Sequence, residues 1–150
     1  MEIFDPLARP FWEMIGMALL CGAIVGIERQ FRGKPAGVRT AILICVSTAV
    51  FIHLGDVAAG ERGDPVRVLG QLVTGVGFLG AGVIMAREGT VTGVTTAAVI
   101  WVLAAIGAAI GLGLYSGALV LAVLTIAVLT GVELLESSLR WLARGIYEKD

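Results

Sequence analysis

The sequence is dominated by five long runs of apolar residues, separated by short stretches rich in glycine, proline and charged residues. A helix needs about 20 apolar residues to cross a hydrocarbon core of about 30 Å. Four runs approach that length unaided, and the second reaches it if the helix extends through Thr40 and past His53. The runs are Phe11–Ile27, Ala41–Leu54, Val68–Ala86, Val94–Leu114 and Leu119–Leu135.

The composition agrees with a membrane protein. Hydrophobic residues make up 57% of the 150 residues and charged residues 15%, whereas a soluble domain has about 45–50% and about 25%. The first ten residues include Glu2 and Asp5, so they do not form the basic segment that begins a signal peptide. We therefore expect an all-α, polytopic bundle of about five transmembrane helices, with the first run retained.

The positions of Lys and Arg predict the orientation of this bundle. With five spans the loops alternate between the two sides, and the eleven basic residues divide into eight and three. The positive-inside rule places the richer side in the cytoplasm, with the N-terminus outside and the C-terminus inside. The eight are Arg29, Arg32, Lys34, Arg39, Arg87, Arg140, Arg144 and Lys149; the three are Arg9, Arg62 and Arg67.

The chain divides into a transmembrane domain, residues 1–136, and a short cytoplasmic tail, residues 137–150. Within the tail, Leu139, Leu142 and Ile146 fall on one helical face, with Arg140 and Arg144 on another. This pattern predicts an amphipathic helix on the inner membrane surface. At the last inter-span connection, Tyr115–Ser116 is interpreted as a tight turn with Ser116 as the N-cap of the fifth helix.

Glycines at short spacing indicate close helix packing, because they remove side-chain bulk where two helices meet. Such packing predicts a tight bundle and a homo-oligomer such as a dimer. An alternative for the third run is a helix broken at its glycines, with carbonyl oxygens exposed to an ion. The packing glycines expected are Gly22, Gly26, Gly75, Gly77, Gly80, Gly82, Gly107 and Gly111.

Polar residues in and beside the third run need a separate explanation. Gln71 and Thr74 lie one turn apart and are costly facing lipid, so we expect them to turn inward to a polar interior shared with the fourth helix. Asp64 is interpreted as an N-cap followed by Pro65, with Arg67 at the outer edge. Asp56, Glu61 and Asp64 could offer oxygen ligands to Mg²⁺, although a solvated loop is the simpler interpretation. No cofactor is predicted, and a metal site is left open.

On the cytoplasmic side, the segment from Glu28 to Thr40 is denser in charge than a connecting loop requires. Glu28 can pair with Arg32 at i, i+4. A wider inner polar cluster is also predicted, formed by Glu28, Arg29, Arg39, Arg87 and Glu133. The sequence has no nucleophile–base pair, metal-hydrolase motif or phosphate loop, which argues against an enzyme.

Taken together, five segments resemble the MgtC/SapB family in order and spacing from about Gly16 to Glu136. They are Gly26–Gln30, Lys34–Thr40, Asp64–Val68, Gly75–Ile84 and Gly93–Trp101. The resemblance implies a bacterial inner-membrane protein linked to magnesium homeostasis, growth at low Mg²⁺ and, in some pathogens, virulence. Longer members continue into a cytoplasmic domain, whereas this sequence stops at Asp150.

Two functions follow as hypotheses. In the first, the protein is a membrane modulator that contacts another membrane protein; in the second, it is a small ion channel or transporter with a polar path between the third and fourth helices. The partners expected are the lipid bilayer, a second copy and a membrane protein, and no nucleic acid. The candidate functional residues are Glu28, Arg29, Arg39, Thr40, Asp64, Arg67, Gln71, Thr74, Thr95 and Thr96.

Overall fold

The computed structural model of the protein describes residues 5–59, 65–87 and 90–138. These residues form five helices and one two-stranded hairpin. The elements are α1 (Arg9–Phe31), α2 (Val38–Ala59), α3 (Pro65–Val83), β1 (Met85–Arg87), β2 (Thr90–Thr92), α4 (Val94–Gly111) and α5 (Tyr115–Ser138). The predicted all-α membrane bundle is confirmed.

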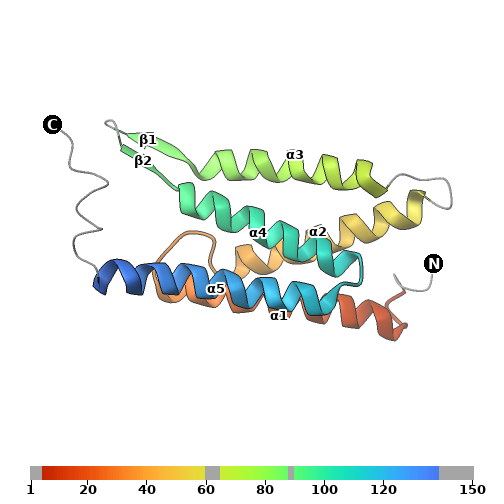
Figure 1. Cartoon of the computed structure of the whole chain (residues 1–150). Helices are drawn as coiled ribbons and strands as arrows, with labels where there is room; N and C mark the ends of the chain where they lie inside the picture. The colour runs from red at the N-terminus through yellow and green to blue at the C-terminus, as the bar shows by residue number, and fades with distance from the viewer. Residues whose placement is uncertain (1–4, 60–64, 88–89, 139–150) are drawn as a thin grey trace.

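Successive helices run in opposite directions along the bundle (Figure 1). The ends of α1, α3 and α5 therefore lie at one end, together with the hairpin and the start of α2 and α4. The short connection between α4 and α5 lies at the opposite end. The end with the hairpin also carries Arg29, Arg32, Lys34 and Arg39, so we call it the basic end.

Four of the helices are long and apolar enough to cross a membrane: Arg9–Phe31, Val38–Ala58, Val94–Gly111 and Tyr115–Leu135. The remaining one, α3, contains a shorter apolar segment, Arg67–Val83. Its 19 residues rise about 28 Å at about 1.5 Å per residue, close to the thickness of the hydrocarbon core. It runs antiparallel to α4 and packs against both α4 and α2 (Figure 1).

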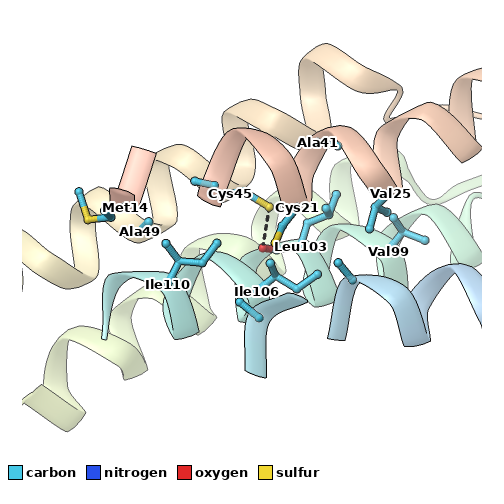
Figure 2. Packing of buried hydrophobic residues seen from close by; sticks show 13 residues of the cluster. Met14, Cys21, Val25, Ala41, Cys45, Ala49, Val99, Leu103, Ile106 and Ile110 are labelled. Atoms are coloured by element: carbon cyan, nitrogen blue, oxygen red, sulfur yellow. Dashed lines mark hydrogen bonds between the residues drawn. The ribbon is translucent and has the colours of Figure 1, made fainter. Parts of the chain in front are cut away.

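The core lies where α1, α2 and α4 meet, with α5 closing one side (Figure 2). Helix α4 is central, because it contacts all four other helices. Small residues let these helices approach closely, and the Cys45 thiol donates a hydrogen bond of 3.4 Å to the carbonyl of Leu103. The buried cluster is Met14, Ala18, Cys21, Val25, Ala41, Cys45, Ala49, Val99, Leu103, Ile106, Ile110, Ala118 and Ala122. A smaller cluster of Val76, Ile100 and Ala104 joins α3 to α4.

The structure corrects two local predictions in the second half of the chain. Helix α3 ends at Val83 instead of Ala86, and an antiparallel hairpin, with Met85 opposite Thr92, joins it to α4. Helix α3 is continuous through its glycines, so the broken-helix alternative is not adopted. The last connection is also displaced, because α4 ends at Gly111 and α5 begins at Tyr115.

That displacement has a clear physical cause. Gly113 adopts a left-handed conformation, with φ of 77°, which glycine tolerates without a steric penalty. The Gly113 N–H donates to Ile110 O at 2.9 Å, and the Leu114 N–H donates to Ala109 O at 2.8 Å. These two bonds form a Schellman motif that ends α4. Ser116 therefore lies inside α5 and is not its N-cap.

Candidate functional site

The last turn of α1 brings charged side chains to the basic end. Helix α1 ends in a Schellman motif: the Gly33 N–H donates to Gln30 O at 3.1 Å, and the Lys34 N–H donates to Arg29 O at 2.9 Å. Gly33 has a φ of 63°, so a residue without a Cβ makes this reversal easy. The motif folds Lys34 back over the helix end.

Arg29 is the most deeply buried charged side chain at this end, with 4% of its surface exposed. Its Nη2 donates a hydrogen bond of 3.3 Å to Oγ1 of Thr96 in the first turn of α4. Its Nε is buried and has no hydrogen-bond partner among the described residues. A buried charge with one neutral partner is only partly compensated.

Glu28 belongs to a chain of ion pairs that joins α1 to α5. Arg32 Nε lies 2.6 Å from Glu28 Oε1, and Arg32 Nη1 pairs with Glu133 on α5. The Glu28 side chain is 9% exposed. Its other oxygen, Oε2, is buried and accepts no hydrogen bond from the described residues.

The hairpin and Gly93 position the first turn of α4. Gly93 has a φ of 90°, and a Cβ built on it would lie 2.0 Å from the carbonyl oxygen of Val83. The chain therefore passes so close to the end of α3 that no side chain fits. The Gly93 carbonyl accepts the first helical hydrogen bond from Ala97 at 2.9 Å, which aligns Thr96 with Arg29.

These elements enclose a cavity of about 710 Å³, which we call the basic-end cavity. Its lining combines polar residues of both charges with aliphatic residues. The polar residues are Glu28, Arg29, Arg32, Lys34, Thr92, Thr95, Thr96 and Glu133; the apolar residues include Val83, Met85, Val91, Val94, Val128, Leu129 and Val132. Such a cavity suits a ligand that has a charged group and an apolar group.

Of the predicted functional residues, the structure brings Glu28, Arg29, Thr95 and Thr96 together in this cavity. Arg39 and Thr40 lie in the first turn of α2, where both are exposed, and they do not line it. The inner cluster therefore forms around Arg32 and Glu133 without Arg39. Nothing is described of the Arg87 side chain.

The prediction of a polar interior between α3 and α4 is wrong. Gln71 and Thr74 are exposed, and the Thr74 hydroxyl donates to Gly70 O at 3.1 Å within its own helix. Gln71 lines a different groove of about 400 Å³ between α2 and α3. The face of α3 that packs on α4 instead presents Val76, which is buried with Ile100.

The opposite end holds the residues considered for an outer metal site. Asp56 and Arg67 are exposed, while Glu61 and Asp64 lie outside the described residues, as does the predicted tail from residue 139 onward. His53 is buried in α2. Within the described part of the chain, no three His, Cys, Asp or Glu side chains are grouped for a metal ion.

The predicted packing glycines fall into two groups. At Gly22 and Gly26 a Cβ would lie 2.7 and 2.6 Å from α2 backbone atoms, and at Gly107 and Gly111 2.6 Å from the carbonyl oxygens of Cys45 and Ala49. Gly80 makes only ordinary contact, 3.6 Å from a Trp101 carbon. Gly75, Gly77 and Gly82 have open space within 4 Å, so they make no close helix contact within the described chain.

Sequence reasoning missed the contributions of Lys34 and Thr92 to the cavity. Thr92 lines the cavity because it belongs to a hairpin that the sequence analysis did not predict. Strands of three residues are too short to give a recognisable alternation of apolar and polar residues. For Lys34 a signal was available, because Gly33 directly after a charged helix end is typical of a Schellman motif.

The bundle and its cavity define a polytopic membrane protein with a charged site at one end of its helices. A model of the MgtC family matches residues 15–138, and the chain belongs to that family. No solved structure matches the chain.

Several curated relatives are similar to most of this chain. The putative magnesium transporter YhiD of Escherichia coli K12 is 47% identical over 124 residues, covering 78% of this chain and 57% of the relative. Protein MgtC of Brucella abortus is 43% identical over 126 residues, covering 84% and 52%. Protein MgtC of Salmonella typhimurium is 42% identical over 113 residues, covering 75% and 48%. The chain thus spans about half the length of these relatives.

Proposed function

We propose that this protein acts in the bacterial inner membrane in magnesium homeostasis and growth at low Mg²⁺, as a modulator that contacts another membrane complex. The link to magnesium rests on its family and on one relative's name, putative magnesium transporter. The apolar helices and the uneven division of basic residues support the assignment to a membrane with a cytoplasmic side.

The observation that carries the modulator function is the exposure of Gln71. Its amide lies on the outside of the bundle, in the groove between α2 and α3. An amide that faces lipid in an apolar helix is costly, and a polar group on a neighbouring protein would satisfy it. Gly75, in the same groove, leaves room for a close approach.

The open glycines of α3 also support self-association. Gly75 and Gly82, two turns apart on one side of α3, leave the helix without side-chain bulk there, as in helices that pack closely across an interface. We propose a homo-oligomer such as a dimer. Disulfide cross-linking between copies through Gly82→Cys in native membranes tests it, and a wholly monomeric product would contradict it.

The alternative function is a small ion channel or transporter, favoured by the charged groups buried in the basic-end cavity. Against it, the residues of α4 from Val99 to Ile110, which pass through the core, are all apolar. Gln71, Thr74, Thr95 and Thr96 also do not meet to form the path that was predicted.

One experiment separates the two functions. A strain that lacks its own family member is supplied with this protein and grown at limiting Mg²⁺, and the purified protein is reconstituted in vesicles loaded with a Mg²⁺-sensitive dye. Restored growth without flux is expected for the modulator. Flux above that of empty vesicles would favour the transporter, and failure to restore growth would contradict both.

A further inference from the structure

The basic-end cavity contains two buried polar atoms that the described chain leaves unsatisfied. Arg29 Nε is a hydrogen-bond donor, and Glu28 Oε2 is an acceptor. They come from consecutive residues, and both side chains line the cavity. Because unsatisfied buried polar groups are costly, a bound molecule that accepts from one and donates to the other is favoured.

The charged side chains that line the cavity also limit the charge of the ligand. Arg29, Arg32 and Lys34 contribute three positive charges to the wall, and Glu28 and Glu133 contribute two negative charges. A bare metal cation would lie beside the buried guanidinium of Arg29, which is unfavourable. A purely anionic group would leave Glu28 Oε2 unpaired. A zwitterion with a phosphate and an ammonium group fits both atoms.

The aliphatic residues of the lining indicate that the ligand has an apolar part. Val128 and Val132 of α5 and Met85 and Val91 of the hairpin line the cavity, yet they are 61, 53, 65 and 57% exposed. The cavity is therefore bordered by aliphatic groups that continue onto the outer surface of the bundle. Acyl chains could follow this surface without leaving the bilayer.

The position of the cavity fits a lipid headgroup. It lies beyond the last turn of α1 and beside the first turn of α4, at the bundle end that carries the basic loop. Helix ends with Lys and Arg residues lie at the level of the phospholipid headgroups. A headgroup can thus enter from the side, between α5 and the hairpin.

We propose that the basic-end cavity binds a zwitterionic phospholipid, phosphatidylethanolamine in chemical class, with its phosphate on Arg29 and its ammonium on Glu28. This inference does not depend on the function proposed above, since a lipid site is compatible with either a modulator or a transporter. Glu28 selects for a headgroup with N–H donors, so phosphatidylcholine, whose quaternary nitrogen has none, is the informative competitor.

The test uses the full chain, delipidated in detergent and studied by native mass spectrometry. It is titrated with phosphatidylethanolamine, phosphatidylglycerol and phosphatidylcholine of identical acyl chains, and with water-soluble glycerophosphoethanolamine. Phosphatidylethanolamine is expected to bind about tenfold more tightly than phosphatidylcholine, the difference that one charge-assisted hydrogen bond supplies. Glycerophosphoethanolamine should bind more weakly than the lipid.

Three variants attribute the binding to the cavity. Glu28→Gln should remove the preference for phosphatidylethanolamine over phosphatidylcholine, and Val132→Trp should weaken binding of every lipid by filling the aliphatic side. Glu13→Gln is the matched control, because Glu13 lies at the other end of α1, paired with Arg9 at 2.8 Å. Melting temperatures of all variants exclude unfolding, and Val132→Trp remains informative if Glu28→Gln does not fold.

Several results would overturn the proposal. Equal binding of phosphatidylethanolamine and phosphatidylcholine would remove the role of Glu28. Equal binding of the lipid and glycerophosphoethanolamine would identify a soluble ligand instead. Lipid binding unaffected by Val132→Trp would move the lipid outside the cavity. Each of these results can be obtained whether or not the protein restores growth at low Mg²⁺.

Discussion

Arg29 shows how a single side chain can hold a membrane bundle together at a cost. It is buried at the end of α1 and donates to Thr96 on α4 across the interior. Few residues are as expensive to bury as arginine, and those that are buried face the interior or a wet cavity. Here the guanidinium does both, because it joins two helices and lines the basic-end cavity.

Gln71 gives the prediction at the level of a single residue. Gln71→Leu should leave the melting temperature nearly unchanged, since the amide is exposed on the outside of the bundle. Growth at limiting Mg²⁺ should fall, because the variant loses a polar contact with the partner protein. Such an interhelical hydrogen bond is worth about 0.6–2 kcal/mol. Complementation of a deletion strain measures the effect.

Thr74→Val is the matched control for Gln71→Leu. It also removes a polar group from the exposed surface of α3, but the Thr74 hydroxyl already bonds to the carbonyl of Gly70. Growth should therefore be unaffected. If Gln71→Leu supports growth as well as the parent protein, the amide has no partner and the modulator function loses its main support.

Among the elements, α4 depends on glycine for its packing against α2, as α1 does. Gly107 and Gly111 lie one turn apart and allow the α2 backbone to come within contact distance of α4. The carbonyl of Cys45 would be 2.6 Å from a Cβ on Gly107, and the Thr48 Cβ 2.7 Å. Neither atom is the free end of a flexible side chain, so α2 or α4 would have to move.

Gly107→Ala should therefore destabilise the bundle. We expect a loss of about 1–3 kcal/mol, the usual cost of overpacking a tight contact. Gly16→Ala in α1 is the control, because nothing lies within 4 Å of its Cβ position and alanine favours the helix by about 1 kcal/mol. Thermal unfolding in detergent compares them, and equal melting temperatures would show that the α2–α4 contact can relax.

The hairpin offers a second prediction for an element. Gly93→Ala should destabilise the α3–α4 connection, because its Cβ would meet the Val83 carbonyl and its φ of 90° disfavours a side chain. Gly113→Ala measures the cost of the left-handed backbone alone, because φ is 77° at Gly113 but its Cβ position is open. A loss of stability of about 1 kcal/mol is expected for this variant. Gly93→Ala should cost clearly more in the same melting assay. A smaller loss than that of Gly113→Ala would mean that the hairpin moves freely.

For the whole molecule, the antiparallel course of the helices places the basic loop and the end of α5 at the same end (Figure 1). Helix α1 begins at the other end. This arrangement agrees with an N-terminus outside and a C-terminus in the cytoplasm, the orientation that the distribution of Lys and Arg predicts.

Cysteine labelling tests this orientation. Cysteines introduced at Gly33 and Glu148 should resist a membrane-impermeant reagent in intact cells, whereas Leu7→Cys, at an exposed position before α1, should react. The native Cys21 and Cys45 are buried and give little background. Labelling at Gly33 in intact cells would contradict the predicted orientation.

The apolar runs were enough to predict the membrane bundle, because burial in lipid requires long helices whatever their neighbours are. Hydropathy and the distribution of Lys and Arg are properties of short sequence segments, so they can be recognised without knowledge of the tertiary structure. Glu28 and Arg29 could likewise be singled out, since charges directly at the edge of an apolar run need a reason.

Which face of each helix points into the bundle depends on tertiary packing. Gln71 and Thr74 were expected inside, but α3 presents Val76 to α4, because that side chain fills the space beside Ile100 and Ala104. The glycines of α3 and α4 look alike in sequence, yet only Gly107 and Gly111 meet another backbone closely. The cavity combines α1, α4, α5 and the hairpin, and contacts between such distant segments arise from packing, which no local pattern encodes.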